Sequence, residues 1–179
     1  VPGSALASLS SPTGDPVIVQ ATINGTPFCF IVDDIARDRV FPTSTLRVQG
    51  RGLAAELDEP NAPVMAFKNA EARTGRQLFD DILTIGGVPI DWMIDTADFT
   101  DWLVPAGVFS HVGTYISAVN AVANAIGAYV QPHNTDRKLN VLLQYPVPAW
   151  EWEGVTPDIE LPAAVVSQES IVWSRKAAY

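Results

Sequence analysis

Positive charge is scarce in this sequence of 179 residues, and so are long apolar runs. There are 11 lysines and arginines against 20 acids, which gives a formal net charge of -9. A surface that holds a phosphate backbone needs clustered cations, so we expect no sequence-specific nucleic-acid partner. No apolar run approaches the roughly 20 residues of a membrane helix, and no signal peptide is recognisable. We therefore expect no membrane partner either.

Cysteine and histidine are almost absent. Cys29 is the single cysteine, so no internal disulfide can form, and its aromatic neighbours favour a buried small hydrophobe over a reactive thiol. His111 and His133 are the two histidines, and neither belongs to a spacing used by zinc sites. Nucleophile elbows, phosphate loops and dinucleotide fingerprints are also missing. We expect no metal, no cofactor and no nucleotide.

Several acids lie close together in the sequence: Asp95, Asp98 and Asp101 three residues apart, Asp33 beside Asp34, and Glu151 near Glu153. The first group lacks the alternating oxygen ligands and the turn glycine of a calcium loop, which favours a solvated acidic loop. The pairs could serve a glycosidase, which needs two carboxylates facing each other across a cleft. Neighbours in sequence do not establish that geometry, so we predict no catalytic residue and no enzyme.

Two of the five tryptophans, Trp150 and Trp152, stand two residues apart. On an extended segment both rings would point to one side, as they do in sugar-stacking platforms. Packing in a core or interface is the simpler interpretation, because prolines surround the pair. A carbohydrate-binding module, with Trp102 as a further member, is nevertheless the second functional hypothesis, and a small hydrolase using buried acids is the third.

The first part of the chain predicts a small β subdomain at residues 17–60, after a linker or loosely held arm at 1–16 that is rich in Ser, Gly and Pro. Strand-forming residues at 17–23 and 26–32 flank Asn24-Gly25, the strongest two-residue hairpin signal. A third strand at 45–49 would complete an antiparallel meander with one face buried.

The segment after this meander predicts a change of structure. Gly50-Arg51-Gly52 is expected to end the sheet, and residues 53–57 to form one short helical turn that Glu59-Pro60 closes. The Pro-containing stretch 59–73 is then a connection and the expected domain boundary.

Residues 73–145 predict an α/β subdomain that contains two copies of a helix-strand unit. The first copy has a helix from Thr74, capped by a Thr74 and Gln77 capping box, and a strand at 88–94. The second copy, shifted by about 40 positions, has a helix at 114–126 and a hairpin that returns through 139–143. The second helix is apolar nearly all round, so it should be buried on more than one side, by another element or another subunit.

The end of the chain, residues 146–179, predicts a Pro- and Trp-rich return followed by a last strand at 171–173. Taken together, the elements predict an α+β protein: an antiparallel β meander or partial barrel, followed by an α/β portion of two helix-strand units. The first residue is Val, which suggests a piece of a longer protein.

The run from Val48 to Asp58 (VQGRGLAAELD), followed by helix, strand, helix and hairpin, resembles the tail-hub or baseplate-hub proteins of tailed bacteriophages, including the late-control type. In that family a strand runs into a Gly-Arg turn and a short acidic helix, and an α/β insertion follows. The resemblance covers about residues 17–179 and depends on the order of the motifs.

This resemblance implies a structural role in the tail of a phage or prophage. Hub subunits associate as homotrimers, cap the tail tube and contact other tail proteins of the spike or fibre complex. The expected location is the virion tail, after assembly in the bacterial host cytoplasm. Some relatives carry a lysozyme or peptidase domain, but this sequence shows no signature of one. On this interpretation residues 17–60 belong to a hub barrel.

Overall fold

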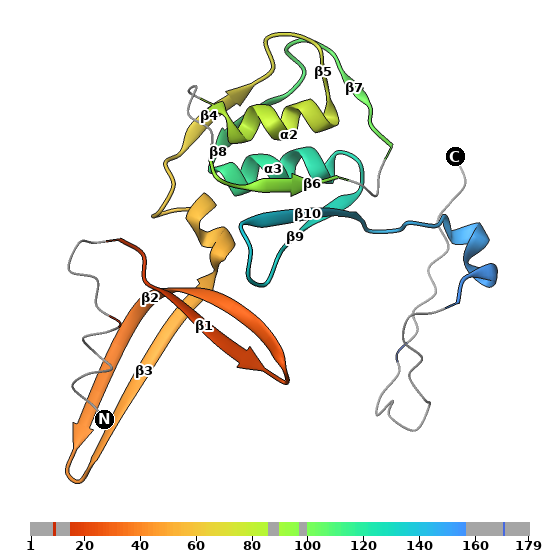
Figure 1. Ribbon diagram of the computed structural model, residues 1–179. Helices are drawn as coiled ribbons and strands as arrows, with labels where there is room; N and C mark the ends of the chain where they lie inside the picture. Colours follow the sequence, from red (N-terminus) through yellow and green to blue (C-terminus); the bar gives the residue numbers. More distant parts are fainter. Residues whose placement is uncertain (1–8, 10–14, 86–89, 97–99, 157–169, 171–179) are drawn as a thin grey trace. The chain divides into compact units, whose positions relative to one another are not determined.

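The computed structural model describes residue 9, residues 15–85, 90–96 and 100–156, and residue 170. The chain is α+β, as its sequence predicts, and it divides into two compact units, residues 1–145 and 146–179. The first unit begins with an antiparallel sheet of three strands in the order β1 (Ile18–Ile23), β2 (Thr26–Val40) and β3 (Thr43–Gly52) (Figure 1).

The turn between β1 and β2 is the predicted two-residue hairpin. Asn24 and Gly25 both have positive φ, 51° and 84°. Positive φ at both central residues defines the type I′ turn, whose twist matches that of the flanking strands. The prediction of the β1–β2 hairpin from Asn24-Gly25 is confirmed.

The third strand and the end of the second differ from the prediction. The sequence places the second strand at 26–32, but β2 continues to Val40, and β3 pairs with it over its whole length. A bulge between Val32 and Asp34 shifts the register, and the pairing resumes beyond it. The predicted buried face is wrong for this distal part, because β2 beyond Ile35 is exposed at every position. Exposure on both faces removes the alternation that a sequence search detects.

The sheet ends at Gly52, so Gly50-Arg51-Gly52 marks its end as predicted, but the three residues still belong to β3, which the sequence predicts to stop at residue 49. Gly50 pairs with Val32 and Gly52 pairs with Phe30. A Cβ atom at Gly50 would overlap the backbone carbonyl oxygen of Ile31, so glycine at this position permits a close approach of the two strands.

The short helical turn after the sheet is confirmed as a 3-10 helix, η1 (Leu53–Leu57). Its Leu53, Ala55 and Leu57 are buried and join the hydrophobic core. The remaining elements of the first unit are β4 (Met65–Lys68), β5 (Arg73–Thr74), α2 (Gly75–Leu83), β6 (Met93–Asp95), β7 (Leu103–Val104), β8 (Ser110–Gly113), α3 (Tyr115–Asn124), β9 (Ala128–Pro132) and β10 (Lys138–Leu143).

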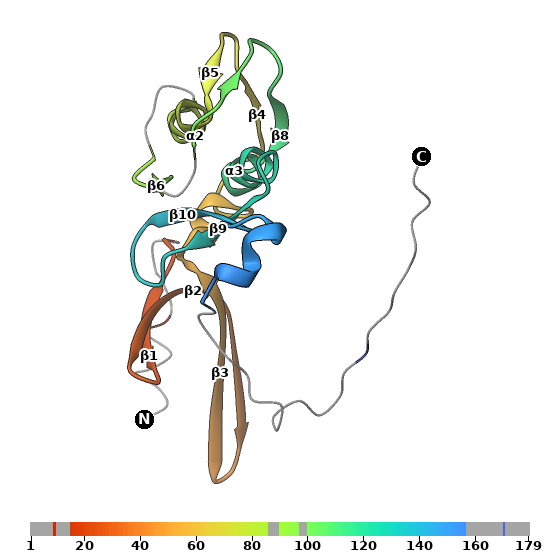
Figure 2. The same cartoon turned by 90° about the vertical axis from the view of Figure 1, so that its right-hand side faces the viewer.

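The two helices lie side by side, and α3 packs on β9 of a second three-stranded sheet of order β6-β10-β9. In this sheet β6 is parallel and β9 antiparallel to β10. Figure 2 looks along both helices. Two small ladders complete this α/β portion, β4 with β8 and β5 with β7. The largest fully buried side chains are Phe67, Phe79, Ile31, Leu57, Ile82, Leu139, Val119 and Val141.

The predicted repeat is confirmed for the two helices, but the cap of the second helix and the strand after the first helix differ from the prediction. Thr74 and Gln77 form the complete capping box of α2. Thr114 makes no such cap, because its hydroxyl donates to Asp58 Oδ1 instead, at 3.0 Å. The strand predicted at 88–94 is β6 at Met93–Asp95; residues 86–89 lie outside the described part of the chain.

Helix α3 is buried on more than one side, as predicted. Its Ala118, Val119, Val122 and Ala123 are buried, and it contacts α2, β8, β9 and η1. The apolar surface that suggested another subunit is therefore covered within the chain.

The second unit contains the 3-10 helix η3 (Ala149–Gly154). The extended segment that the sugar-stacking hypothesis requires at Trp150 and Trp152 is therefore not formed. The predicted strand at 171–173 and most of the predicted arm at 1–16 lie outside the described residues.

Candidate functional surface

The two histidines have structural roles. His111 Nε2 lies 2.8 Å from the Ser117 hydroxyl, at the start of α3. His133 Nδ1 accepts a hydrogen bond from the backbone amide of Asp136 at 3.1 Å, which helps close the β9–β10 hairpin. Within residues 15–85, 90–96 and 100–156, no group of three or more His, Cys, Asp or Glu side chains is placed to hold a metal ion.

The acidic triplet does not converge on one point. Asp95 pairs with Lys138 Nζ at 2.7 Å across the β6–β10 ladder. Asp101 Oδ1 accepts from the amides of Arg76 and Trp102 at 3.1 and 3.0 Å, at the start of α2. Desolvation acts to raise the pKa of Asp101, but hydrogen bonds from Thr74 and from these two amides lower it overall. Asp98 lies outside the described residues.

The remaining acids of the sequence analysis and Cys29 differ in their surroundings. Asp33 binds Arg51, with Arg51 Nε 2.9 Å from Asp33 Oδ2, whereas Asp34 is exposed on β2. Cys29 is half-buried against the core, less buried than its sequence context predicts. Glu151 and Glu153 are exposed on η3.

The three tryptophans of the carbohydrate-binding hypothesis lie in two different parts of the chain. Trp102 covers Gly75, where an added Cβ atom would overlap its indole ring. Trp150 and Trp152 are 83% and 52% exposed on η3, and Trp152 Nε1 donates to the Val147 carbonyl at 2.9 Å. A 3-10 helix turns about 120° per residue, so side chains two residues apart do not share one face. This geometry does not build the sugar-stacking platform.

One pocket of about 390 Å³ lies between α2 and the β4 strand. Apolar side chains and charged ones line it, including Phe67, Leu78, Ile82 and Phe109. Two of its acids pair with Arg73, which lies 2.9 Å from Asp81 and 3.6 Å from Glu71. The buried Asn69 beside it has its amide and its carbonyl bonded to backbone groups. Lys68 of β4 also lines the pocket and is exposed.

Arg51, at the centre of the Gly-Arg motif, connects the first sheet to the α/β portion. Its guanidinium binds the carboxylate of Asp33 on β2, at 2.9 and 3.2 Å, and donates to the carbonyl of Glu59 at 3.2 Å. Asp58 lies 3.7 Å from the same group and accepts from Thr114 before α3. The motif is thus a structural joint at the base of the β2–β3 pair.

A second joint involves Glu56 of η1. Its carboxylate accepts from Arg137 at 2.6 and 2.8 Å and from the indole of Trp92 at 3.2 Å. These three residues come from η1, from the segment before β6 and from the β9–β10 hairpin. The three elements are held together by one carboxylate.

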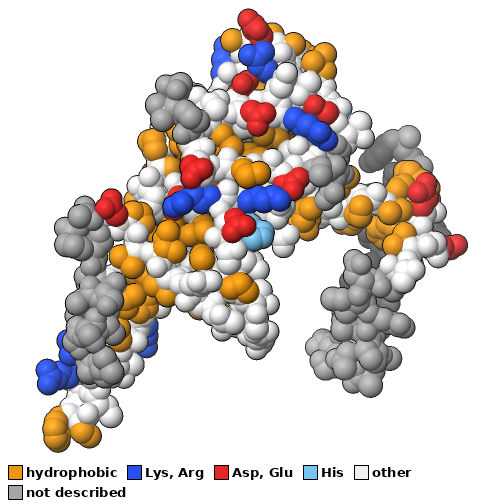
Figure 3. Space-filling model, in the orientation of Figure 1, with side chains coloured by type: hydrophobic (Ala, Val, Ile, Leu, Met, Phe, Trp, Pro, Cys, Tyr) orange, Lys and Arg blue, Asp and Glu red, His pale blue; other side chains and the backbone are white. Residues whose placement is uncertain are grey.

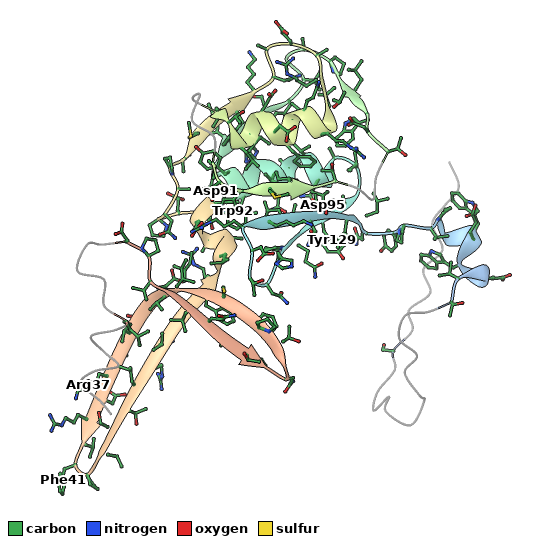
Figure 4. The ribbon with its side chains drawn as sticks, viewed as in Figure 1. Arg37, Phe41, Asp91, Trp92, Asp95 and Tyr129 are labelled. Carbon is green, nitrogen blue, oxygen red and sulfur yellow. The ribbon has the colours of Figure 1, made fainter. Side chains whose placement is uncertain are left out.

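Beyond these joints, β2 and β3 form a two-stranded ribbon, residues 34–49, which extends away from the α/β portion (Figure 1). The distal ribbon ends at Val40 and Phe41, which are 72% and 97% exposed. Figure 4 shows Phe41 at the tip and Arg37 along the strand, both directed outward, and Figure 3 shows apolar side chains at this end with cations near them. This ribbon is the candidate functional surface.

The fold of the described chain is an open antiparallel sheet joined through a Gly-Arg motif to an α/β portion. No protein-family model matches the chain, and no curated protein matches it. Its structure is similar to the crystal structure of the tail protein from Neisseria meningitidis MC58, with a TM-score of 0.50 and 19% sequence identity. The match covers 69% of this chain and 36% of that protein, so the chain spans about a third of its length. The two share a fold, as the order of motifs in the sequence predicts.

Proposed function

We propose that this chain is a structural, non-enzymatic component of a phage or prophage tail, at the hub or baseplate. One observation carries the proposal: 69% of the chain shares its fold with a tail protein. The order of motifs around the Gly-Arg turn supports the same assignment independently of the structural comparison. The protein would act in the virion tail after assembly in the host cytoplasm.

The ion pairs of the described residues support a structural role. Arg51, Glu56 and Arg137 are engaged in ion pairs that join separate elements. The formal charge of -9 suits a wall along which DNA passes without adhering. We propose a homotrimer that connects the tube tip to the spike or fibre complex, with other tail proteins as further partners.

The test of the location is electron microscopy of the tail that carries this protein. Gold-labelled antibodies against residues 15–156 should mark the tip of the tail tube, and a three-dimensional reconstruction should show three copies around the axis. Label confined to the capsid, or absent from purified tails, would reject the tail assignment. Label on the tube or on the fibres would reject the hub position.

The proposal that the chain has no enzymatic activity is tested separately. The purified chain should release no products from cell-wall glycan or from peptide cross-links over a day at neutral pH. A lysozyme of known activity is the positive control. Release of product above the buffer blank would reject this part of the proposal and leave the location open. No geometry at Trp150 and Trp152 favours the carbohydrate-binding alternative.

A further inference from the structure

The side chains of the ribbon at residues 34–49 are mostly exposed, whereas a two-stranded structure needs further packing contacts to be stable. Of the fifteen residues of β2, the last five, Ala36 to Val40, are all exposed, and β3 is exposed except at Leu46 and Arg51. Isolated two-stranded ribbons are marginally stable in water. Contacts with another molecule would supply the missing stabilisation.

The strand edges of the ribbon are open to a partner. Strand β1 pairs with β2 only as far as Ile31, and β3 pairs with β2 alone among the described strands. Within the described part of the chain, the outer edge of β3 over Thr43–Gly52 therefore has no strand partner, and no proline there blocks addition of a strand. Such edges are recurrent protein-binding elements.

The charge of the ribbon is opposite to that of the chain. Residues 34–49 contain three arginines, Arg37, Arg39 and Arg47, and two acids, Asp34 and Asp38, a formal net charge of +1 in a chain of -9. All three arginines are exposed, and no described residue forms an ion pair with them. Residues 53–145 carry eleven acids against five lysines and arginines, a net charge of -6.

We propose that the ribbon is an arm that docks on the α/β portion, residues 53–145, of a second copy of this chain. Charge complementarity selects this occupant, because the basic arm and the acidic portion both belong to the same sequence. The contact is heterologous: an arm from one copy meets a different surface on the next, which closes into a ring when the rotation is right. The inference rests on the proposed structural role and names the element that makes the subunit contact.

The contact would combine two kinds of interaction. Phe41 and Val40 supply an apolar end to be buried, and Arg37 and Arg39 supply cations for exposed carboxylates on the neighbour. The ionic part should weaken with salt, since the charges lie on exposed surfaces before association.

Photo-crosslinking tests the contact directly. Phe41 is replaced by p-benzoylphenylalanine in the full chain, isotopically heavy and light copies are mixed, and the irradiated products are mapped by mass spectrometry. The expected result is a mixed heavy-light adduct between position 41 and residues 53–145. The same probe at Trp150, an exposed aromatic residue of the other unit, is the matched control and should not give this adduct. Adducts within one copy, adducts with a second copy elsewhere, or no adduct at high protein concentration would each overturn the proposal.

Charge reversal tests its ionic part. The double variant Arg37→Glu and Arg39→Glu should weaken self-association in sedimentation velocity at least tenfold at low salt. Lys68→Glu, an exposed reversal on the acidic portion, should leave association as strong or stronger. Unchanged thermal unfolding of both variants would show that folding is preserved. Equal association of the double variant and the wild type would overturn the proposal.

The proposed tail role and the proposed arm contact can be rejected independently of each other. If purified tails carry the protein at the hub but position 41 crosslinks to a different tail protein, the arm inference is wrong and the tail role stands. If the chain is absent from tails yet self-associates through the arm, the tail role is wrong and the arm contact stands.

Discussion

Arg137 binds Glu56 through two hydrogen bonds, 2.6 Å from Nε and 2.8 Å from the terminal nitrogen, although 81 residues separate them in the sequence. Trp92 donates a third hydrogen bond to the same carboxylate. The hydrogen bonds from Arg137 lower the pKa of Glu56, against the opposing effect of desolvation, and the charge of Arg137 and the bond from Trp92 add to the lowering. This arrangement joins the turn after the first sheet to the β9–β10 hairpin.

Replacing Glu56 with glutamine should destabilise the fold. The substitution keeps the size of the side chain but removes the charge that Arg137 and Trp92 bond to. Hydrogen bonds to charged groups contribute up to about 3 kcal/mol when buried, and partial exposure of Arg137 reduces this to about 1–2 kcal/mol. Chemical unfolding measures the difference. Glu71→Gln, an exposed and weakly paired glutamate, is the control and should behave like the wild type.

The stability of the protein should fall in acid. A carboxyl group whose pKa is lowered by folding contributes stability above its ordinary pKa, about 4.3 for glutamate, and that contribution is lost as the pH falls through the lowered value. Glu56 and Asp101 both belong to this class. The gap in unfolding free energy between the wild type and Glu56→Gln should therefore narrow as the pH is lowered from about 6 to about 3. A gap that stays constant would contradict the assigned role of this carboxylate.

Gly25→Val should destabilise the β1–β2 hairpin. Gly25 has a φ of 84°, a conformation that a β-branched residue adopts only under strain. We expect a loss of about 1–2 kcal/mol, measured by thermal or chemical unfolding. Gly52→Val is the matched control, because Gly52 also has open space around its Cα atom and has an extended backbone. Equal effects of the two substitutions would count against the turn assignment.

Gly75→Ala should destabilise the protein, although alanine in place of glycine normally stabilises a helix. A Cβ atom here would overlap the ring of Trp102, and overpacking of this kind costs about 1–3 kcal/mol. The double variant Gly75→Ala and Trp102→Ala tests the cause. If the ring is responsible, the effects of the two changes on unfolding free energy will be less than additive.

Local chemistry determined the elements that the sequence predicts correctly. Asn24-Gly25 favours a type I′ turn because Asn and Gly tolerate the positive φ that this turn needs at both central residues. Thr74 with Gln77 fixes the start of α2 because the two side chains bond to nearby amides. The apolar pattern of α3 determined that this helix is buried. It could not show that neighbours within the same chain cover it.

Tertiary structure decided the rest, because the determining contacts join residues far apart in the sequence. No local sequence pattern predicts the ion pairs of Arg51 with Asp33 and Asp58. The same is true of the ion pair between Arg137 and Glu56. The strand pairing between β2 and β3 continues past residue 32 through backbone hydrogen bonds, which do not depend on an alternating side-chain pattern. The sequence by itself determined that this is an α+β protein without the motifs of a metal or nucleotide site, and only the folded backbone decided that Arg37, Arg39 and Arg47 lie on an exposed ribbon.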